Sequence, residues 1–299
     1  MRPPLHLAIG AFDGVHLGHR AVLRSAREAA RADGGVVGVL TYDPHPSKLL
    51  RPESSVPLIF TRAQKDDRLT EAGAQLIHHE KFDRTHAGIG APEFPKWLKQ
   101  AFPRLKSLHV GSNFQYGRGR AGDGGTLIVH GASAGLAVRL VAAVQLGTET
   151  VSSSRIRQCL ADGDLALANA MLLRPYEAEG PIIGGRRLGR TLGFPTVNIA
   201  WEPELKPAYG VYAVEVIFNG EALPAVANYG LRPTVESGPV TPLLEAHILQ
   251  GAAPTTGDGV RVRWVRRLRA EQKFAELVAL QAQIAKDSAQ ARQALGLLG

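Results

Sequence analysis

Ten residues close to the N-terminus combine glycines with two histidines in a pattern that suits phosphate chemistry. The segment Gly10–His19 reads GAFDGVHLGH and stands between a predicted strand over 5–10 and a predicted helix over 20–32. The first amide groups of a helix have no partner within it, so its N-terminus favours phosphate. His16 and His19 are three residues apart and share one helical face. Two imidazoles there could stabilise the charge that develops during in-line phosphoryl displacement, although two surface histidines without a role are the alternative.

The elements that must position this segment alternate in type. Strands are predicted near 5–10, 35–41, 75–78, 107–111 and 138–144, and helices near 20–32 and 93–101. Strands that alternate with helices indicate a parallel α/β sheet with crossover helices. Ligands of such sheets bind where strands end and helices begin, which is where Gly10–His19 lies.

The pattern changes after Pro175. Short runs near 211–218, 224–228, 243–249 and 260–265 alternate apolar and polar residues and are separated by Gly, Pro and Asn. Such runs favour an antiparallel barrel or sandwich, and a helix over 274–295 closes the chain. The sequence therefore predicts two domains, 1–174 and 175–299.

The composition bounds the class of protein. The chain has 299 residues, of which 44% are hydrophobic and 21% are charged, enough for a substantial core. The single cysteine, Cys159, excludes an internal disulfide and a multi-cysteine zinc site. No apolar run approaches the roughly 18 residues of a membrane span, so we expect a cytoplasmic protein with no membrane contact. The net charge of +8 leaves two classes of partner open, nucleic acid and small polyanions.

Four segments in the first half carry a family resemblance. Gly10–His19 resembles the HxGH nucleotidyltransferase superfamily, and the chain as a whole resembles the bifunctional bacterial riboflavin kinase/FAD synthetases. YDPHP (42–46) is similar to that family's FxPHP, 110–123 to its flavin-side loop, and VSSSRIR (151–157) to its ATP-phosphate motif ISSTxIR. The resemblance implies a Rossmann-like α/β nucleotidyltransferase domain with His16 and His19 as catalytic residues. It further implies ATP binding by Gly10, Phe12, Asp13, Gly14, Ser152, Ser153, Ser154 and Arg157, and flavin binding by Asn113, Phe114 and Arg120.

The second half resembles the riboflavin kinase part of the same family, a mainly antiparallel β-barrel with a C-terminal helix. The motif ending GFPTVN (193–198) assigns Thr196 and Asn198 to Mg²⁺, whose preference for hard oxygen ligands agrees with their chemistry. The segment LEAHIL (244–249) assigns the catalytic base to Glu245. The resemblance also assigns Gly185 and Arg190 to ATP, and Asn228 and Arg269 to the flavin.

The resemblance implies two reactions with ATP and Mg²⁺. Riboflavin would be phosphorylated to FMN, and FMN would be adenylylated to FAD with release of pyrophosphate. The expected partners are riboflavin, FMN and ATP, with no nucleic acid, and the chain is expected to be a monomer or a weak homo-oligomer. Arg261 and Arg263 fall on one face of a predicted strand and suggest a solvated sheet edge, so the positive charge fits anionic substrates better than DNA.

One departure from the family keeps an alternative open. Residues 250–259, QGAAPTTGDG, replace a segment that usually carries an Asp-Phe pair and a Tyr-Gly pair. The alternative is an FAD synthetase whose kinase half has become a flavin-binding module. A basic nucleic-acid-binding protein and an adenylyltransferase for another phosphorylated cofactor are two further hypotheses; the former would bind oligonucleotides with strong salt dependence.

Overall fold

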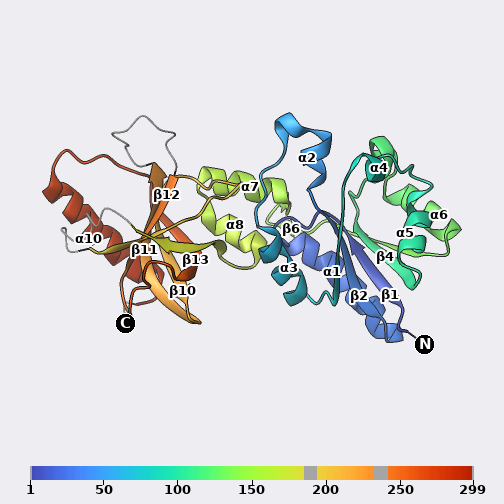
Figure 1. Ribbon diagram of the computed structural model, residues 1–299, viewed down its shortest axis with the longest axis horizontal. Coiled ribbons are helices and arrows are strands. Elements are labelled where there is room, and N and C mark those ends of the chain that lie inside the picture. Colours follow the sequence, from blue (N-terminus) through green and yellow to red (C-terminus); the bar gives the residue numbers. More distant parts are fainter. Residues whose placement is uncertain (1, 185–193, 232–241, 298–299) are drawn as a thin grey trace. The chain divides into compact units, whose positions relative to one another are not determined.

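The structure is a computed structural model that describes residues 2–184, 194–231 and 242–297. The chain forms two compact units, Met1–Ser153 and Ser154–Gly299 (Figure 1). The boundary between these compact units, at 153/154, differs from the predicted domain boundary at 174/175, which stays a prediction. Within the described residues, no helix is both long and apolar enough to cross a membrane.

The first unit is built on a five-stranded sheet with the strand order β3-β2-β1-β4-β5, and every neighbouring pair is parallel. This confirms the predicted Rossmann-like α/β domain. Its elements are β1 (Leu5–Ile9), α1 (Leu17–Asp33), β2 (Val36–Tyr42), α2 (Pro46–Leu50), α3 (Arg62–Glu71), β3 (Leu76–Glu80), α4 (Arg84–Ala87), α5 (Phe94–Ala101), β4 (Leu105–Gly111), α6 (Gly124–Ser133), β5 (Ala137–Val141), β6 (Gln145–Leu146) and β7 (Glu149–Thr150).

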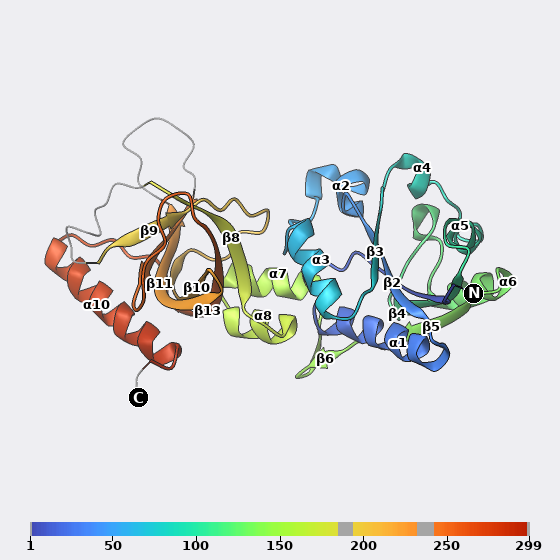
Figure 2. The same ribbon diagram turned by 60° about the horizontal axis from the view of Figure 1, so that its bottom comes forward.

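The sheet is covered on both faces, which explains why β1 is buried at all five positions. Successive side chains of a strand point to opposite faces. Leu5, Leu7 and Ile9 therefore share a core with α5 and α6. Ala8 shares the other core with the buried side of α1 and with Leu69 of α3. The two helical layers are visible in Figure 2.

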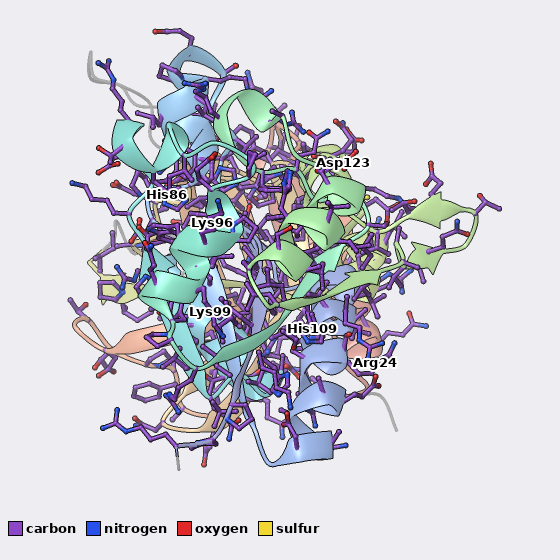
Figure 3. All side chains as sticks on the ribbon, turned by 90° about the vertical axis from the view of Figure 1, so that its right-hand side faces the viewer. Arg24, His86, Lys96, Lys99, His109 and Asp123 are labelled. Atoms are coloured by element: carbon purple, nitrogen blue, oxygen red, sulfur yellow. The ribbon has the colours of Figure 1, made fainter. Side chains whose placement is uncertain are left out.

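A chain of polar side chains runs through the interior beside α1. Asp33 contacts Nε2 of His6 at 3.0 Å, and Nδ1 of His6 lies 2.7 Å from Oγ of Ser107. The same Oγ of Ser107 is hydrogen-bonded to Nε2 of His109 at 2.8 Å, and Nδ1 of His109 is hydrogen-bonded to Oγ of Ser25 at 2.8 Å. His109, labelled in Figure 3, is fully buried, and burial together with the charges of His6 and Arg139 lowers its pKa to about 4. The imidazole of His109 is therefore neutral in the folded unit near neutral pH.

The second unit is a closed antiparallel barrel with the strand order β10-β11-β12-β9-β8-β13, which confirms the predicted barrel. Its elements are α7 (Ser153–Asp162, whose first residue belongs to the first unit), α8 (Leu165–Leu172), β8 (Tyr176–Ile183), β9 (Thr196–Ile199), β10 (Gly210–Phe218), β11 (Glu221–Leu231), β12 (Pro242–Ile248), β13 (Gly259–Arg269) and α10 (Leu277–Ala294). The sequence pattern did not predict β8 or β9, although both are barrel strands.

The expectation of a solvated edge at Arg261 and Arg263 is wrong. Their strand, β13, is paired on both sides, by β10 and by β8, so the barrel has no free edge there. Arg261 contacts Glu179 at 2.6 Å, and Arg263 contacts the buried Glu177 at 3.3 Å. The two arginines are alike in orientation, as expected, but their charges are compensated across the strand pair.

Helices α7 and α8 attach to the barrel through specific hydrogen bonds. The amide of Ala208 donates to the carbonyl of Leu160 in α7 at 2.8 Å. In α8, Nδ2 of Asn169 donates to the carbonyl of Trp264 and its Oδ1 accepts from the amide of Tyr176, both at 2.8 Å. These contacts explain why the second compact unit begins at Ser154.

We predict that acid weakens the first unit through His109. An unfolded histidine has a pKa of about 6.5, so the unfolded chain binds the extra proton at higher pH than the folded chain does. Neutral His109 therefore contributes to the free energy of unfolding above pH 6.5, and this contribution is lost as the pH falls from about 6.5 towards 4. Between pH 7 and 5, the wild type should lose about 2 kcal/mol more unfolding free energy than His109→Gln, as measured by urea unfolding. Equal losses would contradict this role.

We also predict that Asn169→Ala destabilises the second unit. The change leaves a backbone carbonyl and a backbone amide without partners, and each costs about 1–3 kcal/mol. Gln158→Ala is the matched control, because its amide bonds only the exposed Asp162 within α7. Thermal and urea unfolding should show a clear loss for Asn169→Ala and less than about 0.5 kcal/mol for the control. A loss no larger than the control's would argue against the anchoring of α8.

Candidate functional site

The loop between β1 and α1 has an unusual backbone. The amide of Gly10 donates to the carbonyl of Leu40 at 3.1 Å, which ties the end of β1 to β2. Phe12, Gly14 and Val15 all have positive φ angles, of 50°, 89° and 40°. Such angles are strained for Phe and Val, whose side chains are buried and hold the loop in place. This tight loop delivers the chain to the start of α1.

His16 and His19 occupy different roles at the N-terminus of α1. His16 is the N-cap, and its Nδ1 accepts from the amides of Gly18 at 3.2 Å and His19 at 3.4 Å. The ring of His19 stacks on that of His16 at a centroid distance of 3.7 Å and contacts Phe12 edge-on at 5.1 Å. Among the described residues, Nδ1 of His19 has no hydrogen-bond partner.

The electrostatics keep His19 neutral. Burial is the main cause that lowers its pKa well below the ordinary value, and the nearby His16 and Lys65 lower it further. A neutral imidazole donates or accepts through its ring nitrogens without bringing a fixed charge. Placed at a helix N-terminus, it can donate to a phosphate oxygen as charge develops there.

Asp13, within the same motif, organises the loop. Its carboxylate is buried and accepts from the amide of Ile59 at 3.0 and 3.3 Å. Its backbone carbonyl accepts from Oγ of Ser153 at 2.8 Å, across 140 positions of sequence. The structure therefore brings Ser153, in the first half of the 151–157 motif, into contact with the loop. Ser154 and Arg157 follow in α7 and belong to the second compact unit.

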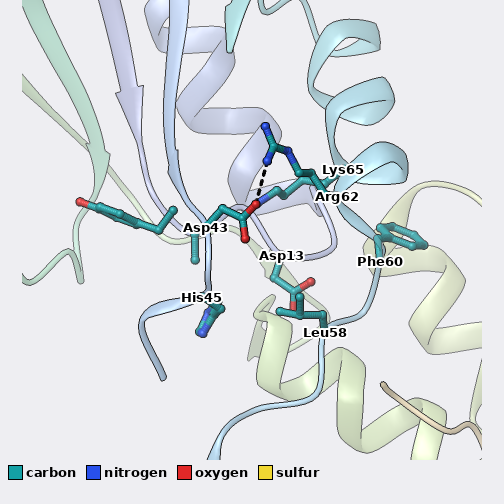
Figure 4. Close-up of a pocket in the computed structure, with 9 residues that line it drawn as sticks. Asp13, Asp43, His45, Leu58, Phe60, Arg62 and Lys65 are labelled. Carbon is teal, nitrogen blue, oxygen red and sulfur yellow. Dashed lines mark hydrogen bonds and ion pairs between the residues drawn. The ribbon is translucent and has the colours of Figure 1, made fainter. Parts of the chain in front are cut away.

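A pocket opens beside this loop, at the carboxyl ends of β1 and β2 (Figure 4). It is lined by Ala11, Asp13, Tyr42, Asp43, His45, Leu58, Phe60, Arg62 and Lys65. Arg62 contacts Asp43 at 2.9 Å, and Nζ of Lys65 donates to Oγ1 of Thr41 at 3.1 Å.

Sequence reasoning missed the two cations of this pocket. Thr61 and Gln64 form a capping box that starts α3, and the pattern TxxQ was a readable signal for that helix. Arg62 and Lys65 lie three residues apart in its first turns and therefore share a face.

The predicted flavin-side residues lie in a separate loop after β4. Phe114 stacks in parallel on Tyr116 at a centroid distance of 6.0 Å, and the hydroxyl of Tyr116 contacts Nδ1 of His130 at 2.8 Å. Asn113 and Arg120 are exposed, and Arg120 has a φ of 61°. The loop presents two polar side chains to solvent, whereas Phe114 and Tyr116 pack against the core of the unit. Its binding role stays a prediction.

In the barrel, strand register brings three predicted residues into one row. Asn228 of β11 pairs with Glu245 of β12, and Glu245 pairs with Asn198 of β9. Residues paired across antiparallel strands project to the same face. Thr196 lies two residues before Asn198 on β9, opposite His247, whose Nδ1 contacts the carbonyl of Pro195 at 2.8 Å. The predicted ATP residues Gly185 and Arg190 lie outside the described residues.

Arg269, predicted to bind flavin, holds α10 in this structure. Its guanidinium forms a two-pronged contact with the buried Asp287, with distances of 2.8 to 3.1 Å, and lies 5.8 Å from the ring of Phe274. Nearby, the carboxylate of Glu271 lies over Gly230, where a Cβ would meet it. Arg269, at the end of β13, therefore attaches the C-terminal helix α10 to the barrel.

The divergent loop 250–259 is tied to the barrel. The amide of Ile182 donates to the carbonyl of Asp258 at 2.8 Å, and the amide of Gly257 donates back to Ile182 at 2.9 Å. The carboxylate of Asp258 also accepts from the amide of Thr255 at 2.7 Å. The loop thus has a defined path beside β8 despite its unusual sequence.

Comparisons with known proteins cover both units. A family model described as FAD synthetase matches residues 2–155, and one described as Riboflavin kinase matches residues 172–295. The chain is 40% identical to the bifunctional riboflavin kinase/FMN adenylyltransferase of Escherichia coli (strain K12), over 97% of this chain and 93% of the relative. It is 33% identical to the Bacillus subtilis (strain 168) protein of the same name, over 95% and 90%. A solved structure described as a macrolide-efflux protein from Streptococcus pneumoniae matches with a TM-score of 0.89 and 27% identity, over 97% of this chain and 94% of that one.

Proposed function

The chain belongs to the family of bifunctional riboflavin kinases/FMN adenylyltransferases, and we propose that it makes FMN from riboflavin and FAD from FMN, using ATP in both reactions. The first unit carries the adenylyl transfer and the barrel carries the phosphorylation. The observation that supports the first assignment best is the stacked His16–His19 pair at the N-terminus of α1.

In adenylyl transfer, an oxygen of the FMN phosphate attacks the α-phosphorus of ATP. The new P–O–P bond forms as the bond from the α-phosphorus to the pyrophosphate breaks, and pyrophosphate leaves with the electron pair. The nucleophile is already anionic, so no strong base is needed, and positioning with charge stabilisation suffices. Neutral His19 donates to a phosphate oxygen, while His16 holds the amides at the helix start. Ser153, Ser154 and Arg157 are proposed to hold phosphates of ATP, together with Gly10, Gly14 and Ser152.

In the barrel, Glu245 is proposed as the base. It takes the proton from the 5′-hydroxyl of the ribityl chain as that oxygen attacks the γ-phosphorus of ATP, and ADP leaves. The row of Asn228, Glu245 and Asn198 places an acceptor between two amide side chains on one face. Asn228 is proposed to orient the flavin.

Mg²⁺ is proposed to bind at Thr196 and Asn198. Their hydroxyl and amide oxygens are hard ligands, and Asn198 lies beside the carboxylate-bearing Glu245 in the register. When bound, the ion neutralises charge on the phosphates of ATP. Thr196 and Asn198 would hold the ion next to Glu245, the proposed base.

Two observations favour an active kinase half over a degenerate one. The Riboflavin kinase model matches through residue 295, and the loop 250–259 keeps defined contacts with β8. We propose that the protein works in the cytoplasm as a monomer or a weak homo-oligomer. Arg261 and Arg263 of β13 contact Glu179 and Glu177, so the charges of these two arginines are compensated within the barrel.

We predict that His19→Ala abolishes FAD formation and leaves FMN formation intact. The change removes the donor at the helix N-terminus, and losing one such donor reduces kcat about 10²- to 10³-fold. His16→Asn is the companion variant, because asparagine keeps an N-cap acceptor but removes the imidazole. The measurement is a timed assay with riboflavin, ATP and Mg²⁺ that resolves riboflavin, FMN and FAD. Loss of both activities in folded His19→Ala would contradict the division of labour.

We predict the complementary result for Glu245→Gln. The amide cannot accept the hydroxyl proton, so FMN formation should fall about 10²- to 10⁴-fold while FAD formation from added FMN stays normal. Glu221→Gln, at the exposed start of β11, is the matched control and should keep both activities. An unimpaired kinase in Glu245→Gln would remove Glu245 from the base role.

A further inference from the structure

Lys65 of α3 presents a half-buried ammonium group at the pocket of the first unit (Figure 4). Its Nζ donates to Oγ1 of Thr41 at 3.1 Å, and that hydroxyl donates to the carbonyl of Ala11 at 3.0 Å. The chain of contacts joins α3 and β2 to the loop that carries the histidines. Lys65 is therefore placed by the same loop that shapes the start of α1.

The carboxylates around Lys65 are engaged elsewhere. Asp43 pairs with Arg62 at 2.9 Å, and Asp13 accepts from the amide of Ile59. Asp66 contacts His79 at 2.8 Å. In the described part of the chain, Lys65 forms no ion pair, and its one polar contact is the neutral hydroxyl of Thr41. Lys81 and Lys106, in contrast, contact Asp83 and Asp33.

An ammonium group withdrawn from water is costly unless a charge compensates it. Burial accordingly lowers the pKa of Lys65, against the opposing effect of Asp13, Asp66 and Asp43 and with a further lowering by Arg62. An anion bound in the pocket would supply the missing charge and restore the ordinary preference for the protonated amine. Because the pocket adjoins the α1 loop, phosphate is the anion whose chemistry fits.

We propose that Lys65 binds a phosphate group of the adenylyl-transfer substrates, as a further residue of that site. The inference rests on the proposed function. The shared chemistry is a phosphate oxyanion, which comes either from the pyrophosphate end of ATP or from the 5′-phosphate of FMN. In either case the lysine forms a charge-assisted hydrogen bond that the free protein lacks.

Binding experiments on the full chain separate the two sources. Pyrophosphate alone and FMN alone are titrated by calorimetry into wild type, Lys65→Met, Lys65→Arg and the control Lys96→Met, which changes an exposed lysine of α5 (Figure 3). All of these substitutions lie in the first unit, so FMN that binds to the barrel contributes equally to all four proteins. We expect Lys65→Met to weaken one of the two ligands about 10- to 100-fold and Lys65→Arg to restore most of it. The weakened ligand identifies the phosphate. Affinities of Lys65→Met within twofold of wild type for both ligands would overturn the proposal.

Activity gives an independent readout. FAD formation from FMN and ATP should lose a similar factor in kcat/KM in Lys65→Met, while phosphorylation of riboflavin stays unchanged and reports a folded barrel. With rising pH, kcat/KM of the wild type should fall as Lys65 loses its proton, at a pH below the ordinary lysine value of about 10.4, and Lys65→Arg should lack that fall. An arginine variant as inactive as Lys65→Met would mean that proton transfer, and not charge, is the role, and would overturn the proposal.

Two controls keep the outcomes distinct. If circular dichroism shows that Lys65→Met is unfolded, Lys65→Gln replaces it, because the amide still donates to Thr41 without a charge. A wild-type protein that forms no FAD would contradict the proposed function, and the titrations with pyrophosphate and with FMN would still decide on Lys65.

Discussion

The candidate site of the first unit depends on one interaction, the capping of helix α1 by the side chain of His16. Nδ1 of His16 accepts from both Gly18 and His19, so the capping side chain is itself an imidazole of the motif. This fixes the start of α1, and the ring of His19 is then held by stacking on its neighbour. The buried Phe12 and Val15 hold the preceding loop at its positive φ angles, and Ser153, 140 positions later in the sequence, bonds the carbonyl of Asp13. The cap pairs two amides that the helix itself leaves without partners, and it fixes His19 at the positive end of the helix dipole.

In the second unit, the register of the barrel strands positions the candidate site residues, and no helix cap is involved in the row that they form. In a closed barrel every strand has two neighbours, so a side chain's place along one strand determines what stands beside it on the next two. Asn228, Glu245 and Asn198 come from segments far apart in the sequence and still form one row. The same closure brings Glu177 and Glu179 against the arginines of β13 and converts a basic stretch into compensated pairs.

The sequence predicted the elements with strong periodicity and missed those without it. The five parallel strands and the antiparallel runs after residue 210 lie where apolar spacing placed them. The pattern missed β8 because two glutamates and a Gly-Pro pair interrupt its apolar alternation, and it missed β9 because that strand has only four residues. Both strands are paired within the barrel. The motif histidines could be found from spacing. Lys65 could not, because its role follows from burial and from the engagement of nearby carboxylates, and neither is visible in a linear pattern.

The position of α7 has a consequence for how such a protein can be divided. Residues 151–157, which are proposed to bind phosphate, span the boundary between the two compact units at Ser153 and Ser154. The helix that continues this segment is hydrogen-bonded to the barrel through Leu160. A cut in the linker just before β8 would strip α7 and α8 from the barrel, whereas a cut at the compact boundary would split the motif. Either cut therefore removes contacts that this structure holds, so one half of the chain expressed alone would need this segment rebuilt.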